Sequence, residues 1–166
     1  TVIWYRDSNH NNSFAYETKD TIKRFVELGG NFFYSGIRPM THMLNVVEYP
    51  FQFSDDSIAK QIFGINSVNY NNMSRFNQAI STETSVCSIP VDITKAPEGL
   101  NYHIIGIESL SPADNAVSYF NYGSEYEDDS NYGQMNNLPI SVIKGSPNGK
   151  TAVLGFPLFY MEPEAA

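Results

Sequence analysis

Residues 26–36 read VELGGNFFYSG, and this stretch decides the fold that the sequence predicts. In front of it, residues 18–28 carry one apolar stripe at helical spacing, which predicts an amphipathic helix. Gly29-Gly30 ends that helix, because glycine adopts the left-handed conformation without a clash at Cβ. Residues 31–34 then form an apolar run typical of a buried strand, and Ser35-Gly36 predicts a turn out of it.

Two further apolar runs belong to the same predicted sheet. Residues 2–5, VIWY, predict a strand before the helix, so residues 2–34 form a strand–helix–strand unit with a right-handed crossover. Residues 149–161 read GKTAVLGFPLFYM, a strand followed by a Gly-Phe-Pro turn. A turn at residues 147–149 joins that strand to an apolar run over 138–144, which predicts a hairpin. We expect the strands at 31–34 and 150–154 to be neighbours in one sheet.

The middle of the chain has a different pattern. Short helices are predicted over residues 39–45 and 58–63, the second closed by Gly64, and residues 66–72 are predicted to form a loop. Runs separated by Pro, Gly and Asn predict short strands at 76–82, 85–89, 102–107 and 116–121. Residues 66–135 therefore predict a β-rich insertion. Residues 161–166 are typical of the first turn of a helix.

The two glycine-bracketed stretches, Gly29-Gly30-x-(apolar)3-Ser35-Gly36 and GKTAVLGFPL at 149–158, resemble class I glutamine amidotransferase-like domains of the ThuA-like branch. The resemblance implies an α/β fold. The architecture that the resemblance implies is a flavodoxin-like three-layer sandwich with a mostly parallel sheet flanked by helices. We expect residues 1–166 to form one such domain, an excised part of a longer protein.

The resemblance also implies that the amidotransferase activity is lost. Active relatives carry a nucleophilic Cys in a Gly-x-Cys-x-Gly turn and a later Phe-His-Pro-Glu run, which together supply a thiolate and an imidazole. Here the turn holds Ser35, and Phe156 and Leu158 stand in place of the His and the Glu. The one cysteine, Cys87, is far from that turn, and we expect it to be a buried small hydrophobe.

Polar side chains follow the first two predicted strands, in the order Asp7, Ser8, His10, Ser35, Arg38 and His42. Ligands of open α/β sheets bind beyond the carboxyl ends of the strands, so we expect these groups to converge. One interpretation is a ligand site at Asp7, Ser35 and Arg38. The other is a Ser/His/Asp hydrolase, in which Ser35 is the nucleophile, His10 or His42 is the base and Asp7 is the acidic member. Phe33 stands where a nucleophile elbow has glycine, which disfavours the second interpretation.

Other candidate sites carry weaker patterns. His10, His42 and His103 lack the spacing of zinc ligands, so no metal is expected there. The acidic segment 125–129 has the charge of a calcium loop without its spacing, and calcium binding by it stays open. Tyrosines at 119, 122, 126 and 132 are sheet residues or a carbohydrate-binding surface.

Composition limits the partners. The net charge of −8 disfavours nucleic acids, whose phosphates need a basic surface, and no apolar stretch is long enough to span a membrane. A single cysteine excludes an internal disulfide. We therefore expect a non-catalytic accessory or interaction domain of a larger, exported (extracytoplasmic) protein. Its partners would be other domains of that protein, and no cofactor is expected.

Overall fold

The computed structural model describes residues 1–6, 14–96, 98, 101–145 and 149–163. Its helices are α1 (Phe14–Glu17), α2 (Lys19–Glu27) and α3 (Pro39–Leu44), with a π-helical segment η1 (Ala59–Phe63) and a 3-10 turn η3 (Leu158–Tyr160). The strands are β1 (Val2–Arg6), β2 (Phe32–Gly36), β3 (Phe51–Gln52), β4 (Ile65–Tyr70), β5 (Gln78–Ser81), β6 (Ile89–Pro90), β7 (Glu108–Pro112), β8 (Phe120–Gly123), β9 (Ser141–Gly145) and β10 (Lys150–Leu154).

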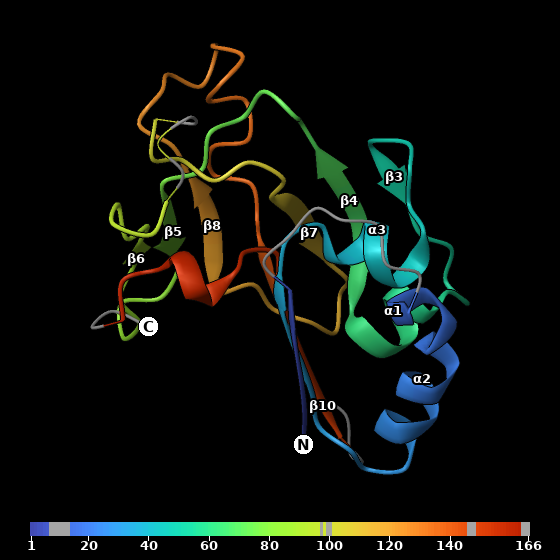
Figure 1. The fold of residues 1–166 in the computed structure, drawn as a ribbon. Coiled ribbons are helices and arrows are strands. Elements are labelled where there is room, and N and C mark those ends of the chain that lie inside the picture. The colour runs from blue at the N-terminus through green and yellow to red at the C-terminus, as the bar shows by residue number, and fades with distance from the viewer. Residues whose placement is uncertain (7–13, 97, 99–100, 146–148, 164–166) are drawn as a thin grey trace.

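The sheet predicted from the two ends of the chain is present. Its order is β1-β2-β10-β9, and we call it the main sheet (Figure 1). β2 pairs in parallel with both β1 and β10, and β9 closes the sheet antiparallel to β10. The strand–helix–strand unit, the hairpin and the pairing of the two glycine-bracketed stretches are therefore confirmed.

Two glycine positions explain why these elements fit together. Gly29 follows α2 with φ 98°, a conformation that favours glycine. A Cβ at Gly149 would lie 2.4 Å from the Gly30 carbonyl oxygen, so only glycine lets the start of β10 approach the helix end this closely. The buried face of α2, with Ile22 and Val26, packs into the same core as Phe32 of β2.

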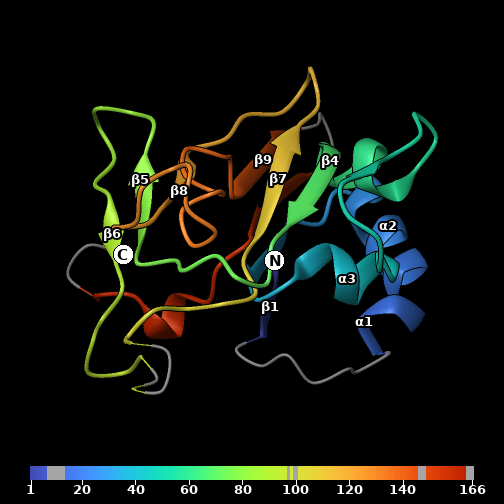
Figure 2. The same cartoon turned by 90° about the horizontal axis from the view of Figure 1, so that it is seen from above.

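The predicted fold class is wrong. The chain is not a flavodoxin-like three-layer sandwich, because the described helices α2, α3 and η1 pack on one side of the main sheet, and the other side has strands and the short η3. Two small antiparallel sheets, β3-β4-β7 and β6-β5-β8, make up most of the remainder. Figure 2 shows β5, β6 and β8 on one side of the molecule and β4, β7 and the helices on the other. The apolar runs at both ends predicted strands of the main sheet correctly, but cover on both faces is wrong for β1, in which Val2 (39%), Ile3 (73%) and Tyr5 (42%) are exposed.

Two elements within the middle segment differ from the prediction. Residues 66–72, expected as a loop, contribute most of β4. Ile65 and Val68 are the only buried residues of this strand, so its sequence is mostly polar and lacks the apolar pattern that predicts a strand. The strand expected over 102–107 is not formed, since Tyr102 (φ 60°) and Gly106 (φ 86°) have left-handed backbones that a strand cannot include. The strand begins at Glu108 instead.

Smaller differences concern strand and helix ends. The strands expected at 85–89 and 116–121 are shifted toward the carboxyl end, to Ile89–Pro90 and Phe120–Gly123. The helix expected from residue 161 is not formed over 161–163, where Met161 instead makes an antiparallel bridge with Val91. Residues 164–166 lie outside the described residues. In the described ranges no helix is both long and apolar enough to cross a bilayer.

Two hydrophobic cores lie on the opposite faces of the main sheet. The first contains Val153 of β10 together with residues of α2, α3, η1 and β4. The second contains the next residue, Leu154, with Phe156, Phe76 and residues of β5, β8 and their connections. Successive side chains of a strand point to opposite faces, so β10 contributes to both cores. The second core draws mainly on the segment predicted as a β-rich insertion.

Candidate functional site

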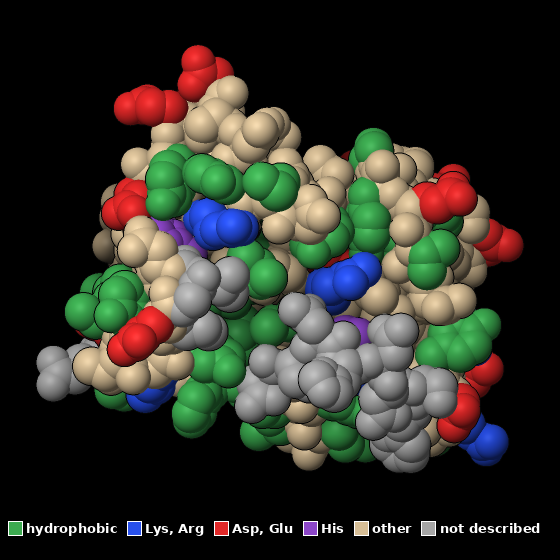
Figure 3. Space-filling model, turned by 45° about the horizontal axis from the view of Figure 1, so that its top comes forward, with side chains coloured by type: hydrophobic (Ala, Val, Ile, Leu, Met, Phe, Trp, Pro, Cys, Tyr) green, Lys and Arg blue, Asp and Glu red, His purple; other side chains and the backbone are tan. Residues whose placement is uncertain are grey.

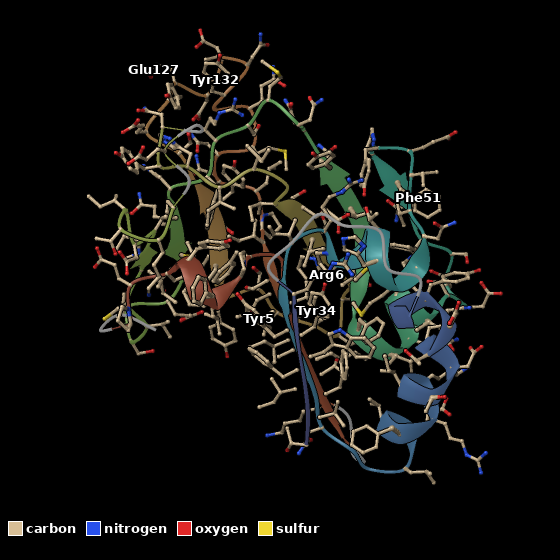
Figure 4. The ribbon with its side chains drawn as sticks, in the orientation of Figure 1. Tyr5, Arg6, Tyr34, Phe51, Glu127 and Tyr132 are labelled. Carbon is tan, nitrogen blue, oxygen red and sulfur yellow. The ribbon has the colours of Figure 1, made fainter. Side chains whose placement is uncertain are left out.

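The carboxyl ends of β1 and β2 bring together Arg6, Tyr34, Arg38, His42 and Glu108, which we call the strand-end cluster. Arg6 ends β1, and Figure 4 shows it beside Tyr34 of β2 on the side of α3. Arg38 has a left-handed backbone (φ 50°), and its N–H donates to the Gly106 carbonyl. This turn starts α3 directly after β2, so Arg38 and His42 lie at the strand ends, as the sequence predicted.

Glu108, which the sequence analysis missed, anchors α3. Its carboxylate is completely buried and accepts bonds from the N–H groups of Met40 (2.7 Å) and Thr41 (3.1 Å). The hydroxyls of Thr41 (2.7 Å) and Tyr49 (2.5 Å) donate to the same carboxylate. Burial raises the pKa of Glu108, and these donors oppose the rise. With both oxygens occupied, Glu108 is a structural carboxylate, not a free acid or base.

Among the described residues, three buried polar atoms of the cluster have no hydrogen-bond partner: Tyr34 Oη, Arg38 Nε and His42 Nε2. Burial, followed by the positive charges of Arg6 and Arg38, lowers the pKa of His42 to about 4. Burial likewise raises the pKa of Tyr34. The cluster at neutral pH therefore holds two guanidinium groups, a neutral imidazole and a neutral phenol. In Figure 3 a histidine and a basic side chain meet near the centre of the visible face.

Ser35 does not join this cluster. Its side chain points to the other face of β2 and is 1% exposed. The hydroxyl donates to the Phe156 carbonyl (2.9 Å) and accepts from the Leu158 N–H (3.1 Å). Phe156 and Leu158 occupy the positions where the resemblance places a catalytic His and Glu, and here their backbone groups bind the serine. Ser35 therefore holds the turn after β10 against β2.

The remaining members of the predicted site cannot be placed. Asp7, Ser8 and His10 lie outside the described residues. The expectation that Cys87 is buried is wrong: it is exposed, in the connection between β5 and β6. That connection is an irregular turn in which residues 82–85, 87 and 88 are all exposed, so the thiol is left in solvent.

The other candidates are dispersed. His103 lies with Glu125 (Nε2–Oε1 3.2 Å), away from His42. Within the described ranges no three His, Cys, Asp or Glu side chains are grouped as metal ligands would be. Tyr122 is buried, and the ring of Tyr132, at the top of Figure 4, meets Tyr126 at 61°. These tyrosines do not form one flat exposed surface.

A second candidate site is a surface of the main sheet that the sequence analysis did not identify. One row of apolar side chains crosses the sheet through paired positions, in the order Ile3, Phe33, Ala152, Ile143 and Val117. We call this row the open face. Ile3 is 73% and Val117 51% exposed, and the other three are partly exposed. The row lies opposite the helices: Figure 4 shows Tyr5 on its side of the sheet and Tyr34 on the other.

The described part of the chain covers the open face only in part: Phe33 packs against the second core, while Ile3 and Val117 stay exposed. In Figure 1, α2 runs along one side of the lower main sheet, and no described element runs along the other. Continuous apolar runs such as VIWY and NFFY indicate cover on both faces. The sequence pattern therefore could not reveal that one face is partly bare.

Comparison with protein-family models, with curated proteins and with solved structures finds no match for this chain. The resemblance to amidotransferase-like domains therefore stays a prediction of the sequence.

Proposed function

We propose that the chain is a non-catalytic interaction domain that binds a protein partner through the open face. The observation that carries this proposal is the five-residue apolar row, in which the described residues leave Ile3 and Val117 exposed and the other three side chains partly exposed. Monomeric proteins rarely leave a contiguous apolar surface of this kind without a use. The row contains no charged side chain, as is typical of the centre of an interface.

Catalysis is disfavoured by the state of the candidate groups. A serine nucleophile needs an imidazole within hydrogen-bond reach. Here the Ser35 hydroxyl is engaged by Phe156 and Leu158, and His42 lies on the other side of β2. The buried carboxylate Glu108 has its oxygens occupied by α3 and Tyr49. These groups stabilise the fold and leave no assembled nucleophile–base pair among the described residues.

The occupant we propose for the open face is an amphipathic helix of the partner. The three strands β1, β2 and β10 are parallel, and parallel strands are almost always covered by helices on both faces. α2 covers one face of them. A helix laid across Ile3, Phe33 and Ala152 would supply the second layer. The partner to test first is another domain of the same longer protein, in an extracytoplasmic compartment.

The test places a photo-crosslinking residue at Ile3 in the natural full-length protein and, as a matched control, at Leu28. Both side chains are exposed and apolar, 73% and 79% respectively, but Leu28 follows α2 on the helical side. We expect position 3 to crosslink to one defined helix, within the protein or in a partner, and position 28 to give no crosslink to it.

The purified partner segment must then bind the domain, and Ile3→Glu must weaken binding by about tenfold or more, since burying an unpaired carboxylate opposes association. Leu28→Glu is the control and should leave binding unchanged. Equal crosslinking from both positions, or binding that tolerates Ile3→Glu, would refute the proposal. Activity that disappears with Ser35→Ala, in a protein that stays folded, would refute its non-catalytic part.

A further inference from the structure

An apolar pocket of about 450 Å³ lies on the helical side of the main sheet, between the start of α2, the end of α3 and β3. Pockets that hold small ligands have volumes of about 300–1,000 Å³, so this pocket is large enough for a small organic molecule. Most of its wall is apolar and consists of Leu44, Val46, Val47, Phe51, Phe53 and Ile58.

The wall joins the first core to the protein surface. Val46 and Phe53 belong to the first core and are 4% and 6% exposed, whereas Phe51 is 41% and Val47 72% exposed. The pocket therefore holds apolar surface in contact with water at its mouth and reaches inward to core residues. Removing such surface from water favours the binding of an apolar body.

The same buried carboxylate that anchors α3 also holds the far wall of the pocket. Glu108 accepts from the Met40 N–H of α3 (2.7 Å) and from the hydroxyl of Tyr49, which lies in the connection from α3 to β3 (2.5 Å). The Phe53 N–H donates to the Asn66 carbonyl of β4 (3.0 Å). These bonds fix the wall before a ligand arrives, which lowers the entropy lost on binding.

Lys19 and Glu48 are the two charged residues among the described lining. The Lys19 ammonium is already engaged by Tyr16: it lies 3.8 Å from the centre of the tyrosine ring and 3.4 Å from the Tyr16 carbonyl oxygen. Tyr16 is not a lining residue. We therefore infer that Lys19 contributes its methylene stem to the pocket and keeps its charge outside it.

Negative charge remains at the mouth of the pocket. Glu48 is exposed and makes no ion pair with a described residue. Asp20 directly follows Lys19, and Asp56 lies between two lining serines; both are exposed. On the right of Figure 3, hydrophobic side chains lie among acidic ones. A cation is favoured at such a mouth and a carboxylate is disfavoured.

We propose that this pocket binds a small amphipathic cation, an alkylamine or arylalkylamine. Its apolar body fills the space lined by Val46, Phe51 and Phe53, and its ammonium lies at the mouth and donates to Glu48. The pocket is on the opposite side of the main sheet from the open face, so this site is independent of the proposed partner-binding surface.

The test is an NMR titration of the methyl-labelled protein with two apolar bodies, octyl and naphthylmethyl, each carrying an amine, a hydroxyl or a carboxylate. We expect saturable shifts of the Val47 and Ile58 methyl groups with at least one amine. At low ionic strength that amine should bind about three- to fivefold tighter than the matching alcohol, and this preference should narrow as salt is added. It should bind about tenfold tighter than the matching carboxylate.

Matched variants locate the apolar body. Val47→Ser removes an exposed apolar side chain from the wall and should weaken the binding of amine and alcohol alike, by about fivefold. Ile93→Ser removes a similarly exposed side chain (67%) that is not in the wall, and should leave binding unchanged.

A second pair of variants locates the ammonium. Glu48→Gln should abolish the preference for the amine over the alcohol and leave the binding of the alcohol unchanged. Glu83→Gln, which neutralises an exposed glutamate in the connection between β5 and β6, should preserve that preference.

The proposal is overturned if neither amine shifts these methyl resonances, or if the carboxylates or the alcohols bind as tightly as the amines. It is also overturned if the variants of each pair behave alike. Crosslinking from position 3 is unaffected by any of these results, so the two proposals fail separately.

Discussion

His42 shows how one residue can report on the strand-end cluster. Its pKa is lowered from 6.5 to about 4 by burial and by the charges of Arg6 and Arg38. A histidine whose pKa is depressed on folding binds protons more weakly in the folded than in the unfolded state. Its stabilising contribution is therefore complete above about pH 6.5 and declines as the pH falls toward 4.

The resulting prediction concerns acid stability. Between about pH 7 and pH 4 the free energy of unfolding should fall by up to about 3 kcal/mol more in the natural protein than in His42→Gln, which cannot be protonated. Urea denaturation at both pH values measures this difference, and carboxylates that titrate in both proteins cancel in the comparison. Identical pH profiles, or an NMR titration of His42 with a midpoint near 6.5, would contradict it.

At the scale of elements, side chains of the main sheet hold η1 by its backbone. The Lys144 ammonium of β9 donates to the carbonyls of Lys60 (3.0 Å) and Gln61 (2.6 Å). The Thr151 hydroxyl of β10 donates to the next carbonyl, that of Ile62 (2.9 Å). Carbonyls near a helix end need such partners, and here the sheet supplies them. The pairing explains why this irregular helix packs at one defined place.

Lys144→Met should therefore destabilise the domain by about 1–3 kcal/mol, because it keeps the apolar stem and removes the charged donor. Lys150→Met is the control: it lies on the adjacent strand with an exposed side chain and should change stability by less than about 0.5 kcal/mol. Chemical denaturation of both variants checks this. Equal effects would show that the two carbonyls are satisfied by other means.

The whole molecule is built around a strand that both cores share. Val153 and Leu154 of β10 are consecutive residues buried in different cores. A loss of packing in one core should therefore also destabilise the other core through β10. This arrangement predicts one cooperative unfolding transition.

Phe156→Ala tests this coupling. Phe156 is completely buried in the second core, so its truncation should cost about 3–5 kcal/mol. Trp4 packs against the first core, and its fluorescence reports on that core. We expect Trp4 fluorescence and far-UV circular dichroism to shift together to a lower midpoint. Should the variant fail to fold, Phe156→Leu gives a milder change of the same kind. A Trp4 midpoint that stays in place while the other signal shifts would indicate two independent units.

Site residues whose position depends on neighbours in the sequence could be predicted, and those that depend on residues distant in sequence could not. The left-handed turn that carries Arg38 and His42 lies directly after β2, so their place at the strand ends was predictable. Glu108 was not, since it reaches α3 from a strand 68 residues away from Met40. The bond of Ser35 to Phe156 in the turn after β10 spans 121 residues, an even longer separation.

By itself the sequence determined the elements whose signals are local: α2, the glycine stop after it, and the apolar strands β1, β2 and β10. Local signals suffice there because the glycines and apolar runs act within a few residues. Only the tertiary structure decided what covers each face of those strands, which turned the expected helical layer into two small antiparallel sheets and an open face. The reason is physical: burial selects apolar side chains whatever packs on them, and strand pairing depends on residues distant in sequence.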